Sequence, residues 1–305
     1  MPSGAFSPTH GRELTTEDLR SLLWEPLESL SVVLAAVTTL GGQLFPSQGV
    51  PVRVPRIDAW PLADVWRAEN ELIAESNPEF GELVLLPASL KSLKVLHRFS
   101  SELARHSAAV GVARALGESL VRRIGLAWDR AALFGAGTVD GNGNRDVLGL
   151  ANTSGIQVMP GIGVPNVDDL HDAVGLLLGA NASLGSAAWF MHSRDFTSLR
   201  KTKDANGQYL VQPDPTQAGA YQLLGGRVLV SNELPTTLGA GANESFALLV
   251  DVRQIAVAQD VIPDYQVLSE TYGQYDQSAL RVVARMDIAA LNAEGIVKLS
   301  GITKP

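Results

Sequence analysis

The chain has 305 residues, 46% of them hydrophobic, which is enough to bury a core in one large domain or two ordinary ones. A formal net charge of −8 and a pI of about 5.2 exclude a global positive field for holding nucleic-acid phosphates, so any relation to nucleic acid is expected to be enclosure. The chain has no cysteine, which excludes disulfides, thiolate nucleophiles and Cys-ligated metals.

Targeting and membrane signals are missing from the sequence. No apolar run reaches the ~20 residues that span a bilayer, and the first residues lack a basic region followed by an apolar stretch. We therefore expect a soluble protein that is made in the cytoplasm and has no membrane partner.

The first 55 residues are interpreted as an N-terminal arm. Residues 1–12 mix turn formers with few apolar side chains, and a short helix is expected before Pro26. A second apolar segment, Leu30 to Leu40, ends at two glycines. Residues 44–61 contain four prolines, a density that excludes a helix and favours an extended chain. This segment is therefore expected to travel away from its own domain.

The stretch from Leu62 to Leu86 is interpreted as two strands joined around residues 75–81, a turn-rich cluster. It contains a single cation, Arg67, and many acids. The acids considered are Glu69, Glu71, Glu75, Glu79 and Glu82. A two-stranded ribbon is marginal alone in water, so a long acidic one indicates support from another surface. On spacing alone, a solvated face stays open as the alternative.

A long helix is expected from Ser101 to Phe134, with Ser100 or Ser101 as its N-cap. Apolar residues recur there in steps that keep them on one stripe of a helix. They are Phe99, Leu103, Val110, Ala113, Leu120, Ile124 and Ala131. A glycine-rich segment ends the helix. At ~1.5 Å per residue its length would be about 50 Å, so it is expected to cross a flat or elongated body.

Strands and helices alternate in the second half of the chain. Asn166 is a candidate N-cap with Asp169 at the third helical position, and a helix is expected from there through Leu178. The other expected elements are a short helix at 195–199, a turn with a strand at 223–230, and strands at 187–191, 246–250, 255–258, 280–288 and 295–299. This alternation indicates an α+β or α/β module.

No residue pattern points to catalysis, a cofactor or a metal. The five histidines are scattered without the spacing of a zinc helix, and no Gly-x-Ser-x-Gly turn is present. Gly135 and Gly137 follow a helix, whereas a phosphate-binding loop follows a strand and begins a helix. We therefore expect that the protein is not an enzyme. Any two carboxylates could meet in space, so a hydrolase or carboxylate-dependent enzyme stays open as an alternative.

Five local motifs follow one another over roughly residues 60–300. They are residues 66–85, residues 90–91 with 99–103, residues 129–138 with Gly149-Leu150, residues 199–209, and residues 224–228. In this order they resemble the extended loop, the entry into the spine helix, the Gly-x-Gly-Thr signature, the Leu-Lys-Asp-x-x-Gly-x-Tyr segment and the following turn of tailed-bacteriophage major capsid proteins, the Hong Kong 97-like fold. Arg227 stands where that family commonly has proline, which affects only the local turn.

The resemblance implies an α+β, Hong Kong 97-like subunit with five parts. They are an N-terminal arm (1–55), an extended loop (56–90), a peripheral domain with the spine helix (91–149), an axial domain (150–260) and a return to the peripheral domain with closing strands (261–305). Copies are expected to form pentamers and hexamers of an icosahedral head that is assembled in the host cytoplasm, encloses double-stranded DNA and becomes the virion. Scaffolding, portal or decoration proteins are implied as further partners, and no cofactor. An encapsulin-like compartment shell is the alternative.

Within this resemblance, the acidic loop is expected to face cations of a neighbouring subunit. The hypothesis pairs Glu69, Glu71, Glu75, Glu79 and Glu82 with Arg98, Arg105, Arg114, Arg122 and Arg123. An exposed ion pair contributes only about 0–1 kcal/mol, so steering and register are the expected roles. Some relatives cross-link through a lysine of the extended loop. This loop has no lysine before Lys91, so no covalent cross-link is expected.

Overall fold

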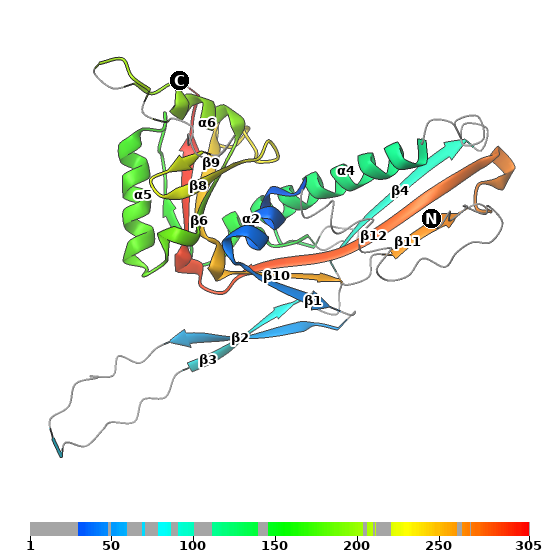
Figure 1. The fold of residues 1–305 in the computed structure, drawn as a ribbon, viewed down its shortest axis with the longest axis horizontal. Helices are drawn as coiled ribbons and strands as arrows, with labels where there is room; N and C mark the ends of the chain where they lie inside the picture. The colour runs from blue at the N-terminus through cyan, green and yellow to red at the C-terminus, as the bar shows by residue number, and fades with distance from the viewer. Residues whose placement is uncertain are drawn as a thin grey trace, which may run out of the picture.

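The fold is a mixture of helices and sheets, as expected from the sequence. The structure is a computed structural model, and it describes residues 30–47, 50–59, 69–70, 79–86, 91–100, 112–139, 146–203, 206–209, 211, 221–260, 264–268 and 270–304. Figure 1 shows an elongated molecule with two parts, one holding α5 and α6 and the other extending along α4 and β12. A two-stranded ribbon, β2 with β3, lies below them.

The predicted capping residues are found at the start of α5 and at the end of α2. In the described residues the helices are α2 (Val32–Leu40), α4 (Val112–Phe134), α5 (Val167–Gly179) and α6 (Ser193–Arg200). The capping box of α5 is confirmed, because Asn166 accepts from the amide of Val167 and its own amide donates to Asp169 at 3.0 Å. Gly41 follows α2 in the left-handed conformation at φ 82°, which ends that helix.

One sheet has six strands in the order β5-β13-β9-β6-β8-β7. They are β5 (Gln157–Met159), β6 (Ala187–Met191), β7 (Gln222–Leu223), β8 (Gly226–Val230), β9 (Ser245–Asp251) and β13 (Ile296–Ile302). Successive side chains point to opposite faces, and in the central strands β6 and β9 both faces are buried. Trp189 packs with the apolar residues of α5 and α6, whereas Phe190 packs in the main core. The prediction of a buried strand at 187–191 is therefore confirmed.

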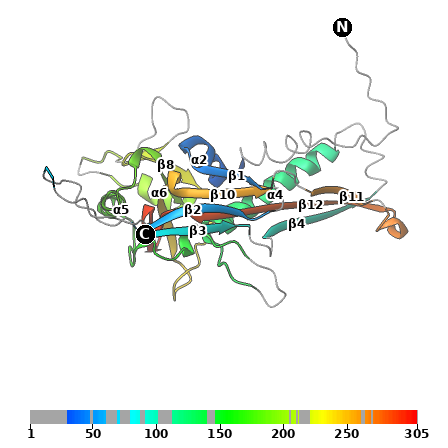
Figure 2. The same cartoon turned by 90° about the horizontal axis from the view of Figure 1, so that it is seen from below.

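The second sheet is organised around β12 (Gln277–Ala290), whose 14 residues extend for about 48 Å. Its other strands are β1 (Gln43–Ser47), β4 (Ser92–Ser100), β10 (Ile255–Asp260) and β11 (Asp264–Leu268). β12 pairs with β10 at one end and with β11 and β4 at the other. Figure 2 shows these strands running side by side along the body. The strands β4 and β11 were not predicted.

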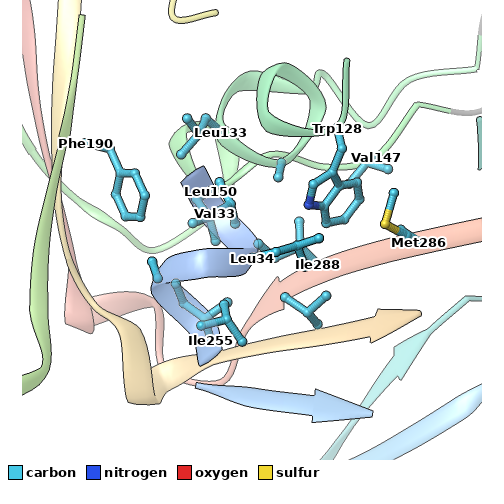
Figure 3. Close-up of a cluster of buried hydrophobic side chains, with 14 of the residues drawn as sticks. Val33, Leu34, Trp128, Leu133, Val147, Leu150, Phe190, Ile255, Met286 and Ile288 are labelled. Atoms are coloured by element: carbon cyan, nitrogen blue, oxygen red, sulfur yellow. The ribbon is translucent and has the colours of Figure 1, made fainter. Parts of the chain in front are cut away.

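The main core lies where both sheets meet α2 and α4 (Figure 3). Val33 and Leu34 from α2 pack with Trp128 from α4 and with Ile288 from β12, and Phe190 reaches the same cluster from the six-stranded sheet. Helices and strands from distant parts of the sequence are therefore buried together, and the two parts of the molecule share one core.

The first residue of the predicted helical stripe is wrong. Phe99, expected to begin the apolar stripe, belongs to β4 instead. Leu93 and Val95 of β4 pack against the core while Leu96 is 48% exposed, so this segment has the two-residue period of a strand. In the described residues α4 has 23 residues, which extend for about 35 Å. Residues 101–111 lie outside the described part.

Residues 32–47 pack inside the body, although the sequence placed them in an arm that leaves it. Val33 and Leu34 are fully buried in the core. The extended conformation predicted from the prolines is confirmed for β1, but this strand lies parallel to β10 as a member of the second sheet. Pairing with β10 gives its backbone groups the hydrogen bonds that they require away from water. Residues 1–29 lie outside the described part.

The ribbon has a different first strand from the one predicted. β3 (Glu79–Leu85) confirms the second predicted strand, but it pairs antiparallel with β2 (Val52–Ala59), a segment assigned to the arm and the base of the loop. Pro55 is compatible with this pairing because a two-stranded ribbon consists of edge strands. Residues 79–81, expected in the turn, belong to β3 instead. The rest of the predicted turn and most of the predicted first strand lie outside the described part.

The base of the ribbon rests on its own chain. Leu85 and Leu86 are each 1% exposed and pack with Val54 of β2 against Ala256 and Ala258 of β10. This contact fixes the point from which the ribbon leaves the body. It also explains how a two-stranded element, which is marginal alone, is stabilised at that end.

Candidate assembly surfaces

A buried aspartate of α4 holds the first turn of α2. Asp129 is 1% exposed, and its Oδ1 accepts hydrogen bonds from Ser31 Oγ at 2.6 Å and from Val33 N at 3.1 Å. Its Oδ2 accepts from Val32 N at 2.9 Å. The first amides of a helix have no partner within the helix, and the helix dipole favours a carboxylate there. Asp129 therefore joins α2 to α4.

The environment of Asp129 opposes its charge. Burial is the largest influence and raises the pKa of Asp129 above its ordinary value. The hydrogen bonds from Ser31, Val32 and Val33 act in the opposite direction, and Glu233 adds to the rise.

A second buried aspartate fastens the ribbon to β12. Asp287 is 1% exposed; its Oδ2 accepts from Leu86 N at 3.0 Å and its Oδ1 accepts from Lys91 Nζ at 2.8 Å. Leu86 directly follows β3 and Lys91 directly precedes β4. Both ends of the segment between the ribbon and the second sheet therefore meet at one carboxylate.

Sequence reasoning missed both aspartates. Each interrupts an apolar stretch, Asp129 after Trp128 and Asp287 between Met286 and Ile288. A charged residue inside an apolar run that is expected to be buried requires a partner, because an unpaired buried charge is strongly unfavourable. That conflict was the available signal, although it does not identify the partner.

A third polar cluster joins α6 to the last strand. Arg194 donates from Nε to Asp195 Oδ1 at 3.0 Å and from Nη2 to Ser245 Oγ at 2.7 Å and Ile302 O at 3.3 Å. Ser245 Oγ in turn donates to Asp195 Oδ2 at 2.6 Å. These residues begin α6, begin β9 and end β13, so the cluster closes one end of the six-stranded sheet.

Next to this cluster, His192 caps α6 and makes its stability depend on pH. Its Nδ1 accepts a hydrogen bond from Arg194 N at 3.0 Å, which requires the neutral ring. Burial, and secondarily Arg194, lower the pKa of His192, while Asp195 raises it. This contribution to stability is therefore present above the ordinary pKa of about 6.5 and lost as the pH falls through that value toward the lower pKa of the folded state.

We expect the His192→Asn variant to lose less stability than the wild type between pH 7.5 and pH 5. Asparagine keeps an N-cap acceptor and does not titrate. The difference should be about 1 kcal/mol or less, the usual contribution of one cap. Urea unfolding of both proteins at each pH measures it. Equal losses in the two proteins would show that this histidine does not act as a titrating cap.

Of the predicted acids, Glu69 and Glu82 have described, exposed side chains. Glu82 lies on β3 and pairs with Arg53 of β2 at 3.1 Å, across the ribbon of the same chain. Both side chains are exposed, so the pair contributes only about 0–1 kcal/mol and leaves Glu82 available to a neighbour. Glu79 lies in β3 without a described side chain, and Glu71 and Glu75 lie outside the described part.

The predicted cations divide between two surfaces. Arg122 and Arg123 are exposed on α4, and Arg98 is exposed on β4, with its guanidinium carbon 5.3 Å from the ring centroid of Tyr272. The side chain of Arg114, in α4, is not described. Arg105 lies outside the described part. Among described residues, none of these arginines forms an ion pair with a predicted acid of the same chain.

Sequence reasoning missed further cations on the face of the second sheet that is turned away from α4. Lys94 is exposed on β4, and Arg281 and Arg285 are half-buried on β12, the paired strand. Arg285 also holds Asp260 at 3.0 Å. Together with Arg98 these residues form the cationic sheet face. The alternation within the predicted strand 280–288 was a signal that residues 281 and 285 share a face.

A small pocket, and no metal-binding group, are found among the described residues. No group of three His, Cys, Asp or Glu side chains there could hold a metal ion, and no helix in this part is long and apolar enough to cross a membrane. A pocket of about 100 Å³ lies between α4 and β4, where Trp128 and Lys91 line it. Sites for small molecules are usually at least about 300 Å³.

Comparisons with known proteins agree with this arrangement. The sequence pattern that defines the phage capsid family matches residues 12–301. No curated protein matches the chain. The structure is similar to the capsid of the empty GTA particle, solved with C5 symmetry, with a TM-score of 0.63 and 18% identity over 98% of this chain and 95% of that one.

Two further structures are similar over almost the whole chain. For Microbacterium phage Oxtober96 the TM-score is 0.65 and the identity 15%, covering 100% of this chain and 96% of that one. For the holo-SrpI encapsulin complex from Synechococcus elongatus PCC 7942 the TM-score is 0.57 and the identity 12%, covering 96% and 93%. At these identities the likeness shows the fold, and it is the Hong Kong 97-like fold implied by the sequence motifs.

Proposed function

This chain belongs to the phage capsid family, and from that premise we propose that it is the major capsid protein of an icosahedral head that encloses double-stranded DNA. The observation that carries the proposal is the family pattern, which extends over residues 12–301 and thus over both parts of the molecule. The capsid family consists of structural proteins, and on that basis we propose no enzymatic activity for this one.

The parts of the molecule support specific roles in a shell. We assign residues 91–149 and 261–305 to a peripheral domain, residues 150–260 to an axial domain, residues 56–90 to the extended loop and residues 1–55 to the N-terminal arm. In the described residues this arm includes α2 and β1, which pack on the body, and the first residues of β2, which belong to the ribbon. Copies would close into pentamers and hexamers, because head-to-tail contacts form rings when the rotation permits.

The same fold also occurs in a compartment shell. The encapsulin structure is similar to this chain, but with a lower TM-score than the phage and GTA capsids named above. The family pattern further favours the phage head. Virion localisation, assembly in the host cytoplasm and contacts with scaffolding, portal or decoration proteins follow as parts of the proposal.

Contacts between the acidic loop and a neighbour's cations are part of the same proposal. The two candidate acceptors are the cationic sheet face and the exposed arginines of α4. Arg98 belongs to the first surface and Arg122 to the second, and the second sheet separates them. Long cationic side chains on a flat sheet can meet several acids of an extended ribbon at once, which favours steering and register over the affinity of any one pair.

Expression of the chain alone is expected to produce closed particles. They should elute in the void volume of a size-exclusion column and appear as shells by negative-stain electron microscopy. Elution as a monomer or small oligomer under several salt and pH conditions would contradict the proposed function. Finding an enzyme enclosed in the particles purified from the native source, instead of DNA, would favour the compartment shell.

Reversing the charge of Glu71 or Glu75 to lysine is expected to reduce particle yield while the subunit stays soluble. Repulsion between the reversed ribbon and the cations of a neighbour costs on the order of 1 kcal/mol per contact, repeated at every interface. The matched control is Glu270→Lys, in the exposed turn between β11 and β12, which changes the net charge equally. Equal yields from the ribbon and control variants would argue against the pairing.

A further inference from the structure

The β5 edge of the six-stranded sheet carries an acidic and apolar surface. Gln157 Nε2 donates to Leu176 O at 3.2 Å and to Glu294 O at 2.7 Å, so β5, α5 and the turn before β13 form one continuous surface. Leu176 is 38% exposed, and Glu294 and Asp172 are exposed. Asp172 lies one helical turn before Leu176, and Asp168 one turn earlier still, so they share a stripe of α5.

Lys298, the described cation on the strand beside β5, is directed to the face of the sheet opposite α5. Lys298 lies on β13 directly opposite Val158 of β5, but its Nζ donates to Ala151 O at 3.1 Å. Burial lowers the pKa of Lys298 as well. Val158 itself is 50% exposed. The β5 edge therefore presents apolar side chains together with a net negative charge.

The opposite edge of the same sheet has the complementary character. β7 and β8 form this edge, and Arg227 is exposed on β8. Arg200 and Lys201, exposed at the end of α6, lie beside it, because the guanidinium of Arg200 is 5.0 Å from the ring centroid of Tyr221, the residue before β7. Val230, at the end of β8, is 36% exposed. This edge therefore combines an exposed apolar side chain with positive charge.

We infer that the β5 edge of one copy of this chain docks against the β7–β8 edge of the next copy, with Asp172 and Glu294 facing Lys201 and Arg227. The two edges are at opposite ends of the strand order, so contacts between them are head-to-tail and can close into a ring. Pairing of like edges would place acids against acids or cations against cations, which is unfavourable. The charges thus select the direction of the ring as well as the partner.

This inference rests on the proposed function, since it assigns contacts within the assembling shell. The acidic edge carries exposed Leu176 on the side of α5 and the cationic edge carries exposed Val230, so each combines an apolar side chain with charge, as protein interfaces do. The contact deepens the proposal by naming which two surfaces of the axial domain meet. It also predicts that the ring depends on ionic strength.

The test is a charge swap within one chain. The acid-reversed variant carries Asp172→Lys and Glu294→Lys, and the base-reversed variant carries Lys201→Glu and Arg227→Glu. Each should lower shell yield about tenfold, because the reversed edges repel each other. In the variant with all four changes the β5 edge is cationic and the β7–β8 edge is acidic, so the two edges still attract each other. Its yield should return to within about threefold of the wild type. A neutral variant, Asp172→Asn with Glu294→Gln, should fall between the wild type and the acid-reversed variant.

The outcomes separate this inference from the proposed function. All four side chains are exposed, so the urea midpoints of the variant subunits should match the wild type. If the wild type forms shells and either reversed variant forms them equally well, or if the fourfold swap is no better than its two parents, the edge pairing is overturned. If a reversed variant loses its fold, unchanged yield in the neutral variant overturns it too. If the wild type forms no shells at all, the proposed function fails and this contact with it.

Discussion

Replacing Asp129 with alanine is expected to lower the free energy of unfolding of the subunit by about 3 kcal/mol. The substitution removes the acceptor of Ser31 Oγ, Val32 N and Val33 N, and these groups stay buried or half-buried without a partner. It also detaches α2 from α4, the two helices that bury Leu34 and Trp128 together. Urea unfolding followed by tryptophan fluorescence measures the change.

Two comparisons make the Asp129 prediction specific. Asp129→Asn should lose roughly half as much, because one carbonyl acceptor remains and burial already disfavours the charge. Asp172→Ala, on the exposed stripe of α5, is the matched control and should change the free energy by less than about 0.5 kcal/mol. A loss at Asp129 no larger than that of the control would show that the cap does not stabilise the fold.

Replacing Asp287 with alanine is expected to lower the free energy of unfolding of the subunit by about 4 kcal/mol. Its removal leaves the ammonium of Lys91, whose side chain is 14% exposed, without the carboxylate that neutralises it. The amide of Leu86 also loses its acceptor. Because both contacts hold the base of the ribbon, the particle yield should fall more than the loss of subunit stability alone explains.

A double-mutant cycle checks the Asp287 prediction. The Lys91→Met variant removes the charge but keeps the apolar length of the side chain, and adding it to Asp287→Ala should recover part of the lost stability. The expected coupling is at least about 1 kcal/mol in urea unfolding. Additive losses would contradict a direct pair. Unchanged particle yield in a folded Asp287→Ala subunit would contradict the role of this carboxylate in holding the ribbon.

Much of the part that holds α5 and the six-stranded sheet could be predicted from short stretches of sequence. The start of α5 was readable from Asn166 and Asp169, because a capping box satisfies its hydrogen bonds within four residues. The strand β6 was readable from a run of five apolar residues, since both faces of its sheet are buried. In both cases the interactions that decide the conformation involve residue types, not particular distant partners.

The errors fall where the deciding partner is far away in sequence. Phe99 fits the helical stripe of the residues after it, yet β4 pairs with β12, which places Phe99 opposite Ser278. Residues 52–59 were read correctly as extended, but their partner β3 was not identified, because prolines and β-branched residues do not encode register. In both cases the structure of the segment depended on which distant strand it pairs with.

The candidate contact surfaces also differ in whether neighbouring residues or distant partners define them. The acidity of the loop and the cations of the helix region were visible as charges in the sequence, and they supported the hypothesis of contact between copies. The cationic sheet face was not visible, since it requires the pairing of β4 with β12 to place Lys94 and Arg285 on one surface. The two edges of the six-stranded sheet likewise required the strand order.

The sequence by itself determined the family of this protein, the alternation of its helices and strands and the acidity of its loop, because motifs, periodicity and charge are properties of neighbouring residues. Only the tertiary structure decided that α2 and β1 belong to the body and that β2 is the partner of β3. It also decided that Asp129 and Asp287 are buried and connect elements that are distant in the sequence. Burial and strand pairing join residues that are far apart along the chain. Their free energy is therefore set by the whole packed arrangement and not by any one segment.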